Sequence, residues 1–272
     1  MATFLFWNIH RKPLSARIAR IAAGNAVDVV ILAECELEPS DVVTSLNSLS
    51  YGWESIPSIG NGIRVFSRLS DVTWHLPQTE AHWSIYRIES RHFPDCYIAA
   101  AHLLSKLYSE RQDQELGVRS LMTDIRKVER DMQPTRTILV GDLNMNPFED
   151  GITGADGIHG VMSHSIVTAE NKRTKRTVQQ REYEYFYNPM WGLFGDRTPG
   201  PSGTYFARST GAISYFWYML DQVLVRPSLM GKLKDVRILD SDGSQSLVTK
   251  SGRPDTKNGS DHLPLLFRIG LN

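Results

Sequence analysis

The chain has 272 residues, of which 41% are hydrophobic and 22% charged, a balance typical of a folded globular protein that can bury a large core. Its 30 Lys and Arg residues balance 30 Asp and Glu residues, so the overall charge gives no sign of a nucleic-acid or membrane partner. The 2 cysteines are too few for a disulfide scaffold, and their spacing does not suit a structural zinc site.

Hydropathy along the chain gives no sign of a membrane segment. No stretch approaches the ~20 apolar residues of a membrane span. The N-terminus lacks a signal-peptide pattern, because Phe4–Trp7 already has the pattern of a core strand. Cys35 and Cys96 lie in apolar runs and are expected to be small buried side chains. We therefore expect a cytoplasmic protein with no membrane partner.

Strand and helix patterns alternate along the first half of the chain. Apolar runs predict three buried strands that each deliver a polar residue at the end: Thr3–Ile9 with Asn8, Asp28–Ala33 with Glu34, and Cys96–Ala101 with His102. Apolar residues at helical spacing predict helices over Leu14–Gly24, over Ser40–Leu49 with Ser40 as the N-cap, and over Val118–Met132. Residues 62–100 have the pattern of several strands separated by turns.

The segment Ile138–Pro147 is the most informative part of the sequence. Ile138–Val140 predicts a short buried strand, and the Gly-Asp-x-Asn-x-Asn-Pro sequence that follows breaks it. Asp142 and Asn144 are two residues apart at the strand end, so their side chains point the same way. This arrangement suits holding a metal-bound water or a phosphate oxygen, although both residue types are also common in turns.

The periodic pattern is lost between Gly151 and about Ser214. Glycines come first, then a basic run, then a stretch rich in aromatic residues. Basic side chains interleaved with aromatic ones suit the binding of single-stranded nucleic acid, and a solvated loop over a satellite core explains the pattern equally well. The candidate substrate-binding residues in this segment are Lys172, Arg173, Lys175 and Arg176.

Strand patterns return near the C-terminus. Tyr218–Val225 contains Asp221, and Leu263–Ile269 follows Asp261 and His262. Gly203-Thr204-Tyr205 is expected to lead into a strand near the site. Alternating strands and helices with many extra strands indicate an α/β (α+β) protein. We expect a single domain over residues 1–272 with a substrate-side insertion at about 151–203.

Polar residues thus end six predicted strands. Each has an ordinary explanation by itself, but ionisable groups next to apolar strands are costly to bury unless they are paired, hydrogen-bonded or bound to metal. Carboxylate and amide oxygens are hard ligands that suit Mg²⁺ or Mn²⁺. The set consists of Asn8, Glu34, His102, Asp142 with Asn144, Asp221, and Asp261 with His262.

In these residues the chain resembles the endonuclease/exonuclease/phosphatase superfamily of DNase I-like, metal-dependent phosphodiesterases. The Gly-Asp-x-Asn and Ser-Asp-His-x-Pro sequences are the specific motifs. The matching segments follow the family's order and are Trp7-Asn8, Ala33-Glu34, Ala101-His102-Leu103, Gly141–Asn144, Leu220–Val225 and Ser260–Pro264. The resemblance implies a four-layered, two-sheet sandwich with the active site at one end of the paired sheets.

The resemblance also implies attack of water on a phosphoric ester with the help of a bound Mg²⁺ (or Mn²⁺). It makes Glu34 the main metal ligand, assisted by Asn8 and Asp261. It also implies that His262, paired with Asp221, acts on the attacking water or binds the scissile phosphate, and that Asp142 orients or activates the nucleophile. By the same resemblance, Asn144 hydrogen-bonds the phosphate, and His102 contacts the phosphate or protonates the leaving group.

Two departures from subgroup patterns limit the substrate assignment. AP endonucleases usually carry an acidic residue two positions after the first-strand asparagine, where this chain has His10. His10 is either a contact to substrate or metal or a solvated loop residue. The segment Trp217–Gln222 lacks the signature of inositol phosphatases.

We therefore expect a phosphodiesterase or nuclease acting on nucleic acid or a nucleotide-like diester. One alternative is a phosphomonoesterase or lipid phosphodiesterase on the same scaffold, with Met190–Phe194 as a candidate membrane-binding loop. The other is a non-catalytic binding module that kept the fold, against which the complete set of polar residues argues. The pattern leaves the number of metals and the oligomeric state open.

Overall fold

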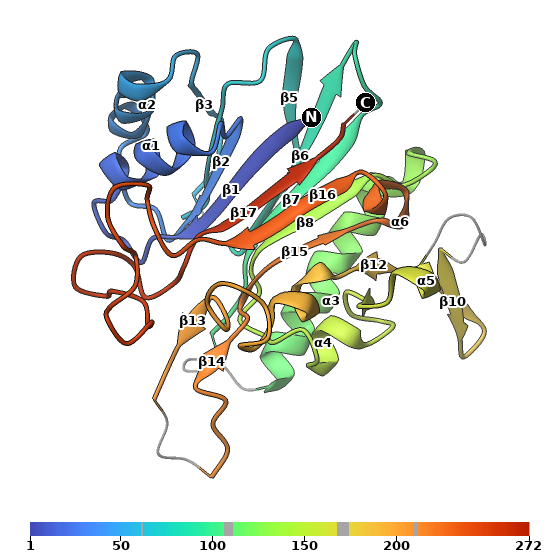
Figure 1. Ribbon diagram of the computed structural model, residues 1–272. Helices are drawn as coiled ribbons and strands as arrows, with labels where there is room; N and C mark the ends of the chain where they lie inside the picture. The colour runs from blue at the N-terminus through green and yellow to red at the C-terminus, as the bar shows by residue number, and fades with distance from the viewer. Residues whose placement is uncertain (61, 106–110, 168–173, 209–211, 272) are drawn as a thin grey trace.

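Two β-sheets packed face to face form the body of the protein (Figure 1). The computed structural model describes residues 1–60, 62–105, 111–167, 174–208 and 212–271. The first sheet has six strands in the order β16 (Leu233–Ile238), β17 (Leu265–Ile269), β1 (Ala2–Asn8), β2 (Val29–Ala33), β4 (Arg64–Ser67) and β3 (Glu54–Ile56). The second has seven, in the order β5 (Val72–Thr79), β6 (Trp83–Ser90), β7 (Cys96–His102), β8 (Thr137–Asp142), β15 (Asp221–Val225), β12 (Phe186–Tyr187) and β9 (Gly160–Val161).

Helices cover the outer faces of the two sheets (Figure 1). On the first sheet lie α1 (Ser15–Gly24) and α2 (Pro39–Leu49), and on the second lie α3 (Arg111–Val128) and α4 (Asp150–Thr153). The shorter helical elements are η1 (Glu129–Asp131), α5 (His164–Val167), η3 (Pro189–Leu193) and α6 (Pro227–Met230). Two hairpins are separate from the large sheets: β10 (Lys175–Val178) with β11 (Arg181–Glu184), and β13 (Tyr205–Phe206) with β14 (Trp217–Tyr218).

The side chains of β1 show why four layers form. Phe4 and Phe6 point into the core between the sheets, where Phe4 stacks on Phe267 with ring centroids 4.8 Å apart. Leu5 and Trp7 point to the opposite face and pack with the helices on the outside. Because both faces of the strand are covered, every position is buried and Phe4–Trp7 is a continuous hydrophobic run. The predicted four-layered, two-sheet sandwich is confirmed.

Strand pairing brings the polar strand ends together. β1 runs parallel to β2, and β7 runs parallel to β8, so the carboxyl ends of each pair lie at one edge. In register, Asn8 pairs with Ala33, the residue before Glu34, and His102 pairs with Asp142. β15 runs antiparallel to β8 and therefore begins at this edge, with Asp221 opposite Asp142. The topology alone thus gathers side chains that are more than 100 residues apart in sequence.

The contact between β7 and β8 explains why the Gly-Asp-x-Asn motif begins with a glycine, Gly141. A Cβ at this position would lie 2.0 Å from the backbone oxygen of Ala101 on the neighbouring strand β7. Any side chain would therefore push β7 and β8 apart at the residue before Asp142. Glycine is required here for the close approach of two backbones.

Most predicted elements are present with small shifts at their ends. The helix predicted to begin at Ser40 begins at Pro39, with Glu38 as the flanking residue, because proline is favoured in the first helical turn. The strand predicted over Tyr218–Val225 is split: Tyr218 belongs to the β13–β14 hairpin, and only β15 joins the second sheet. Cys35 and Cys96 are free and buried, as expected.

The segment without sequence periodicity completes one edge of the second sheet. β12 pairs with both β15 and β9 through two-residue strands, which are too short to leave a periodic pattern. Among the described residues, no helix has the length and apolar character needed to cross a bilayer.

Candidate active site

Asp142 is the centre of the polar cluster at this edge. It is buried at the end of β8, and its carboxylate accepts hydrogen bonds from the Asn8 amide at 3.0 Å and the Asn144 backbone N–H at 3.0 Å. Two imidazoles face the same oxygen, Oδ2: His262 Nε2 at 3.7 Å and His102 Nε2 at 3.8 Å. Asp142 therefore contacts residues from both sheets.

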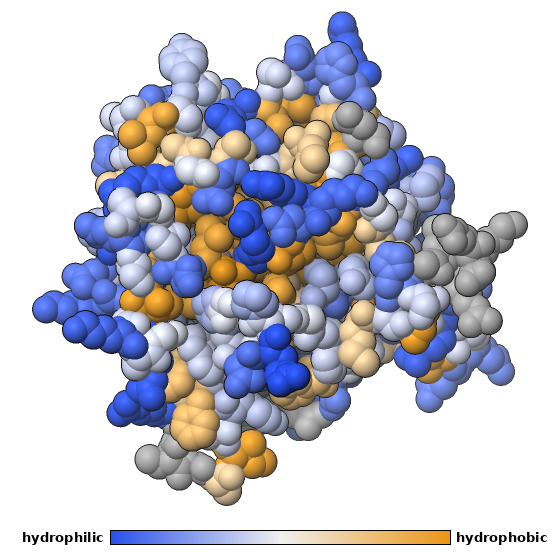
Figure 2. Space-filling view, in the orientation of Figure 1, coloured by the Kyte–Doolittle hydropathy of each residue, from blue (hydrophilic) through white to orange (hydrophobic). Residues whose placement is uncertain are grey.

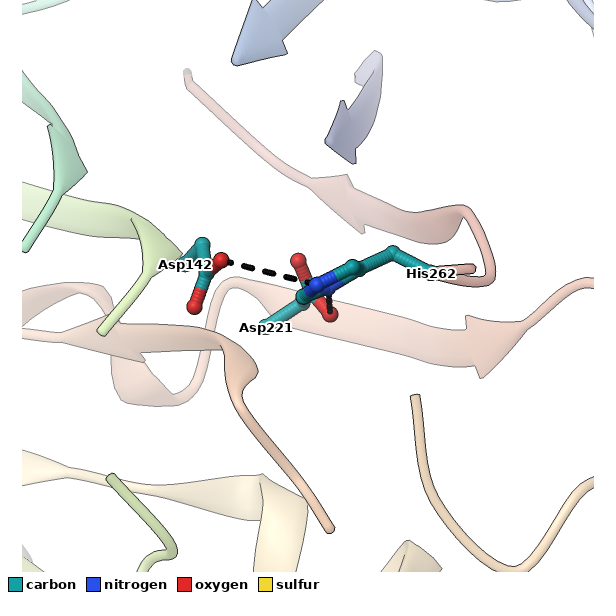
Figure 3. Close-up of side chains that lie close together, drawn as sticks. All are labelled: Asp142, Asp221 and His262. Atoms are coloured by element: carbon teal, nitrogen blue, oxygen red, sulfur yellow. Dashed lines mark hydrogen bonds and ion pairs between the residues drawn. The ribbon is translucent and has the colours of Figure 1, made fainter. Parts of the chain in front are cut away.

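Asp221 and His262 form a buried pair beside Asp142 (Figure 3). Asp221 Oδ2 and His262 Nδ1 are 2.8 Å apart, and the opposite ring nitrogen, Nε2, faces Asp142. Figure 3 shows the three side chains pointing toward one another, with the imidazole between the two carboxylates. The three residues have ligand atoms within 4.8 Å of one another, but His262 Nδ1 is already bonded to Asp221. The arrangement fixes the imidazole so that Nε2 is the atom presented to the site.

The charges of this pair are strongly coupled. Burial raises the pKa of Asp221, although the charge of His262 opposes this effect. Burial lowers the pKa of His262, but the charges of Asp221 and Asp142 outweigh burial and raise that pKa to about 10. Both pKa shifts have the same meaning: the Asp221–His262 pair holds its shared proton at neutral pH. A cationic imidazole with a free Nε2–H can stabilise charge on a phosphoryl oxygen.

Glu34 is partly exposed and is linked to Asp142 through Asn8. The Asn8 amide nitrogen donates to Glu34 Oε1 at 3.2 Å as well as to Asp142, so one side chain bridges the two carboxylates. Its amide oxygen accepts from the His10 backbone N–H at 3.0 Å. His102 Nε2 lies 3.6 Å from Glu34 Oε1. Asn8 thus sets the spacing between the two acidic groups.

Asp261 approaches the same region from the segment before β17. The Ser260 hydroxyl donates to the Asn8 backbone oxygen at 2.7 Å and lies 3.3 Å from Asp261 Oδ1, which ties the Ser-Asp-His motif to the end of β1. Asp261 Oδ1 and Glu34 Oε2 both lie 3.7 Å from His10 Nδ1. Both carboxylate side chains are partly exposed, 20% for Glu34 and 24% for Asp261.

This partly exposed side has the donor chemistry of a divalent-cation site. Two carboxylates and an amide are hard oxygen donors of the kind that bind Mg²⁺ and Mn²⁺. The contacts of Glu34 Oε2 with His10 and Arg11 are 3.7 Å long, which is beyond the reach of a hydrogen bond. Glu34 is therefore only partly satisfied by its protein neighbours and fits the part of a metal ligand.

Asn144 is buried and makes two well-defined bonds. Its backbone N–H donates to Asp142, and its side-chain NH₂ donates to the Leu103 backbone oxygen at 2.8 Å. Its φ of 52° is in the left-handed region, which asparagine tolerates better than most residues. In this arrangement Asn144 holds the β8 turn against the end of β7.

Three supporting residues were not included in the sequence-based site. Trp7 Nε1 donates to the His262 backbone oxygen at 2.9 Å, and the Thr204 hydroxyl accepts from the backbone N–H groups of Leu220 and Asp221 at 3.1 and 3.0 Å. The Tyr205 ring centroid lies 4.8 Å from that of His262. The adjacency of Trp7 to Asn8 and the predicted Gly-Thr-Tyr strand were the sequence signals for these positions, but neither identifies the contacts.

The structure does not bring the described residues of the basic run to the site. Lys172 and Arg173 lie outside the described residues. Lys175 and Arg176 are exposed on β10, whose hairpin partner β11 contacts the beginning of β8 through Glu184 and Thr135. Asp142 is at the other end of this six-residue strand, about 17 Å away. Figure 1 likewise shows β10 far from the hairpin β13–β14 that adjoins His262.

Comparison with known proteins agrees with the fold and with the family resemblance. The profile of the Endonuclease/Exonuclease/phosphatase family matches residues 5–262. No curated protein gives a significant sequence match. Similar solved structures include the mannosyl-6-phosphatase Bt3783 of Bacteroides thetaiotaomicron, which is 12% identical, with a TM-score of 0.61 and coverage of 99% of this chain and 100% of that chain.

Two further structures are bound to DNA products. The 3′ phosphatase NExo (D146N) from Neisseria, with a product DNA hairpin, is 17% identical, with a TM-score of 0.59 and coverage of 99% of this chain and 100% of that chain. TDP2 from D. rerio, with a single-strand DNA product, is 16% identical, with a TM-score of 0.57 and coverage of 99% and 98%. At these identities the structural likeness shows the fold, whereas the family profile spans nearly the whole chain. The protein therefore belongs to the endonuclease/exonuclease/phosphatase family.

Proposed function

We propose that this protein is a divalent-metal-dependent hydrolase of phosphoric esters whose preferred substrate is a phosphodiester of nucleic acid or a nucleotide-like molecule. The observation that carries the proposal is the buried Asp221–His262 pair aimed at Asp142, next to the partly exposed carboxylates of Glu34 and Asp261. Membership of a family of phosphoesterases supports this reaction class.

In this proposal, Asp142, His262 and His102 orient the attacking water, stabilise charge on the phosphate and transfer protons. Asp142 is the residue to orient the attacking water, because its carboxylate is fixed by Asn8 and by the Asn144 backbone. His262 would donate its Nε2–H to a phosphoryl oxygen while Asp221 holds the ring in place. His102 faces the same space from β7 and is the candidate to contact the phosphate or protonate the leaving group.

Glu34 and Asp261 are the residues that would hold Mg²⁺ or Mn²⁺, with Asn8 next to them. A bound cation would neutralise charge that develops on the phosphoryl and leaving-group oxygens. The roles of Asn8 as a metal ligand and of Asn144 as a phosphate donor remain predictions. In this structure the Asn8 amide oxygen accepts from the His10 backbone N–H, and the Asn144 side-chain NH₂ donates to the Leu103 oxygen.

Aromatic side chains beside His262 support a nucleotide-like substrate. Tyr205 packs on His262, and a line of ring contacts continues to Tyr218 at 6.3 Å and from there to Tyr215 at 5.9 Å. Tyr215 and Phe216 are each 51% exposed, and the nearby Ile213 is 76% exposed. Figure 2 shows apolar side chains at the lower end of this face, over the β13–β14 hairpin. Exposed rings at a phosphoesterase site can stack on bases.

A phosphomonoesterase on the same site is the second candidate. Two of the similar structures are described as phosphatases, one of which acts on a 3′ phosphate of DNA. A phosphomonoester needs the same charge stabilisation, so the residues above do not separate the two reactions. The terminal and internal phosphates of one oligonucleotide are the substrates that would separate them.

The test is hydrolysis by purified protein with Mg²⁺, Mn²⁺ or EDTA. The substrates are single- and double-stranded DNA, RNA, a 3′-phosphorylated oligonucleotide, a sugar phosphate and phospholipid vesicles. The variant Asp142→Asn, which keeps the side-chain shape, serves as the contamination control and should reduce turnover by at least about 100-fold. Metal-dependent cleavage of internal bonds that is lost in the variant would establish the phosphodiesterase. Release of terminal phosphate alone would move the protein to the phosphomonoesterase group, and equal rates in both proteins would contradict the site.

A further inference from the structure

His10 follows β1 in a tightly fixed turn. His10 and Arg11 both have positive φ, 48° and 57°, which is costly for residues with a side chain. Three hydrogen bonds hold the turn: His10 N–H to the Asn8 side-chain oxygen at 3.0 Å, Arg11 N–H to the Glu34 backbone oxygen at 2.9 Å, and Lys12 N–H to the Ile9 oxygen at 3.0 Å. From this turn the His10 ring lies back over the ends of β1 and β2, near Glu34 and Asp261.

The ring nitrogen that faces inward lies between two carboxylates. His10 Nδ1 is 3.7 Å from Glu34 Oε2 and 3.7 Å from Asp261 Oδ1. These separations are too long for hydrogen bonds. They are within the ~4.2 Å that can separate two ligand atoms bound to one cation at ~2.1 Å. The side chain is 54% exposed, so the ring is at the rim of the site, where a cation can reach it from solvent.

We propose that His10 Nδ1 is a ligand of the active-site cation, together with Glu34 and Asp261, and that this nitrogen makes the site prefer Mn²⁺ and other transition-metal ions over Mg²⁺. The inference rests on the metal-dependent function proposed above. An all-oxygen ligand set suits Mg²⁺, whereas an imidazole adds affinity for first-row transition metals and little for Mg²⁺. His102 is the other imidazole near Glu34, but it also faces Asp142 and so lies on the substrate side.

A simpler explanation makes the opposite prediction for metal affinity. If His10 is only a counter-ion for the two carboxylates, a bound cation must displace it. Removing the imidazole would then strengthen metal binding. If His10 is a ligand, removing it weakens metal binding. The sign of the change in affinity therefore separates the two explanations.

The experiment measures Mn²⁺ and Mg²⁺ affinity by titration calorimetry, and the surroundings of bound Mn²⁺ by pulsed electron paramagnetic resonance. The proteins are the wild type, His10→Ala, His10→Asp and the control His92→Ala, since His92 is an exposed histidine on another turn with only a distant 4.0 Å contact to Asp71. We expect His10→Ala to raise the Mn²⁺ dissociation constant by at least about tenfold and to remove the nitrogen coupling from the resonance spectrum. His10→Asp should lower the ratio of the Mg²⁺ to the Mn²⁺ dissociation constant by about tenfold. Circular dichroism would verify that each variant is folded.

Three results with His10→Ala would overturn the inference. They are unchanged Mn²⁺ affinity in His10→Ala, tighter binding in that variant, or nitrogen coupling that persists in it and so belongs to another histidine. Wild-type protein that binds neither ion would contradict the metal-dependent function as well. Wild-type protein that binds Mn²⁺ without any nitrogen coupling would contradict only the role of His10.

Discussion

At the residue scale, the backbone at the site is as distinctive as the side chains. Glu34, His10 and Asn144 have φ angles of 47°, 48° and 52°. Each such conformation costs on the order of 1–3 kcal/mol and persists only where surrounding contacts fix it. The fixing contacts are hydrogen bonds to Asn8, Asp142 and neighbouring strand ends. The neighbours of these three residues thus hold them in a costly conformation, as is common at functional sites.

Replacement of Asp221 by asparagine should separate activity from stability. Asp221→Asn keeps the shape of the side chain but removes the charge that holds the proton on His262, so turnover should fall by at least about 100-fold. Burial raises the pKa of Asp221, which means that its charge is costly in the folded protein. Because the buried His262 can lose its proton when this charge is removed, the free energy of unfolding should fall by less than the ~3–5 kcal/mol that an unpaired buried charge costs. Steady-state kinetics and urea unfolding measure the two effects. A large loss of stability with unchanged turnover would show that Asp221 is only structural.

At the element scale, the site depends on strands that meet closely at one edge. Asp142 is placed by the parallel pairing of β7 with β8 and by the antiparallel pairing of β8 with β15. The close approach of β7 and β8 allows no side chain at position 141. The other ends of β8 and β15 are joined by a buried ion pair, Glu129 with Arg226. The close contact at Gly141 and the Glu129–Arg226 ion pair both fix the strands that carry Asp142 and Asp221, and so fix the position of the site.

A pair of glycine substitutions tests the close approach of the strands. Gly141→Ala would place a Cβ 2.0 Å from the Ala101 oxygen, and it should lower the free energy of unfolding by about 3 kcal/mol or more. The matched control is Gly117→Ala on α3, where the new Cβ meets nothing within 4 Å, and alanine should stabilise the helix by about 1 kcal/mol. Thermal and urea unfolding measure both effects. Equal effects of the two substitutions would be inconsistent with this account of the motif glycine.

Removal of one partner of the buried Arg226–Glu129 ion pair should strongly lower the free energy of unfolding of the protein. Arg226 is 1% exposed, its guanidinium donates to Glu129 at 2.8 and 2.6 Å, and it lies 4.0 Å from the Phe186 ring centroid. Arg226→Met leaves the Glu129 carboxylate buried without its main partner and should cost about 3–5 kcal/mol. The double variant with Glu129→Leu should recover much of this loss. Urea unfolding of the single and double variants checks the prediction, and additive losses would refute the coupling.

At the scale of the whole molecule, the site is shared between the two sheets. Asn8, Glu34 and His262 belong to the ends of first-sheet strands, whereas Asp142 and Asp221 belong to the second sheet. Relative movement of the sheets would therefore open the hydrogen bonds between Asn8, Asp142, His262 and Asp221. The packed core between the sheets is what keeps the site in register.

Acid should destabilise the edge of the second sheet that β9 and β12 complete, because His159 is buried next to β9. Burial lowers the pKa of His159 to about 4 from its ordinary value of 6.5, while Nδ1 donates to the Glu184 backbone oxygen at 3.2 Å. The unfolded chain then binds more protons than the folded one between pH 6.5 and 4, so stability present above pH 6.5 is lost as the pH falls toward 4. The loss should reach up to about 3 kcal/mol.

Urea unfolding at a series of pH values measures this loss. His159→Phe keeps a ring against Tyr185, whose centroid is 4.5 Å away, and should flatten the pH dependence in this window. His92→Gln, at an exposed histidine, should leave the pH dependence unchanged. An identical slope in His159→Phe and the wild type would assign the acid sensitivity to other groups.

The sequence by itself was enough to find the fold and the principal polar residues. Buried strands of parallel pairs are continuous apolar runs, and the polar residue that ends each one is visible in the sequence as Asn8, Glu34, His102 and Asp142. The family profile over residues 5–262 confirms the family predicted from those residues. Local pattern carries this information because the periodicity and termination of a strand are properties of neighbouring residues.

Only the tertiary structure decided which polar groups meet and at what distance. Three features depend on the pairing of segments far apart in the chain. They are the position of His10 between Glu34 and Asp261, the contact of Tyr205 with His262, and the remoteness of Lys175 from the site. The strands β9 and β12, which lie next to the β10–β11 hairpin in the sequence, have two residues each and leave no periodic signal. The position of this hairpin was therefore not predictable from the sequence. A sequence records what each strand end carries, whereas the long-range register of the sheets determines which ends are neighbours.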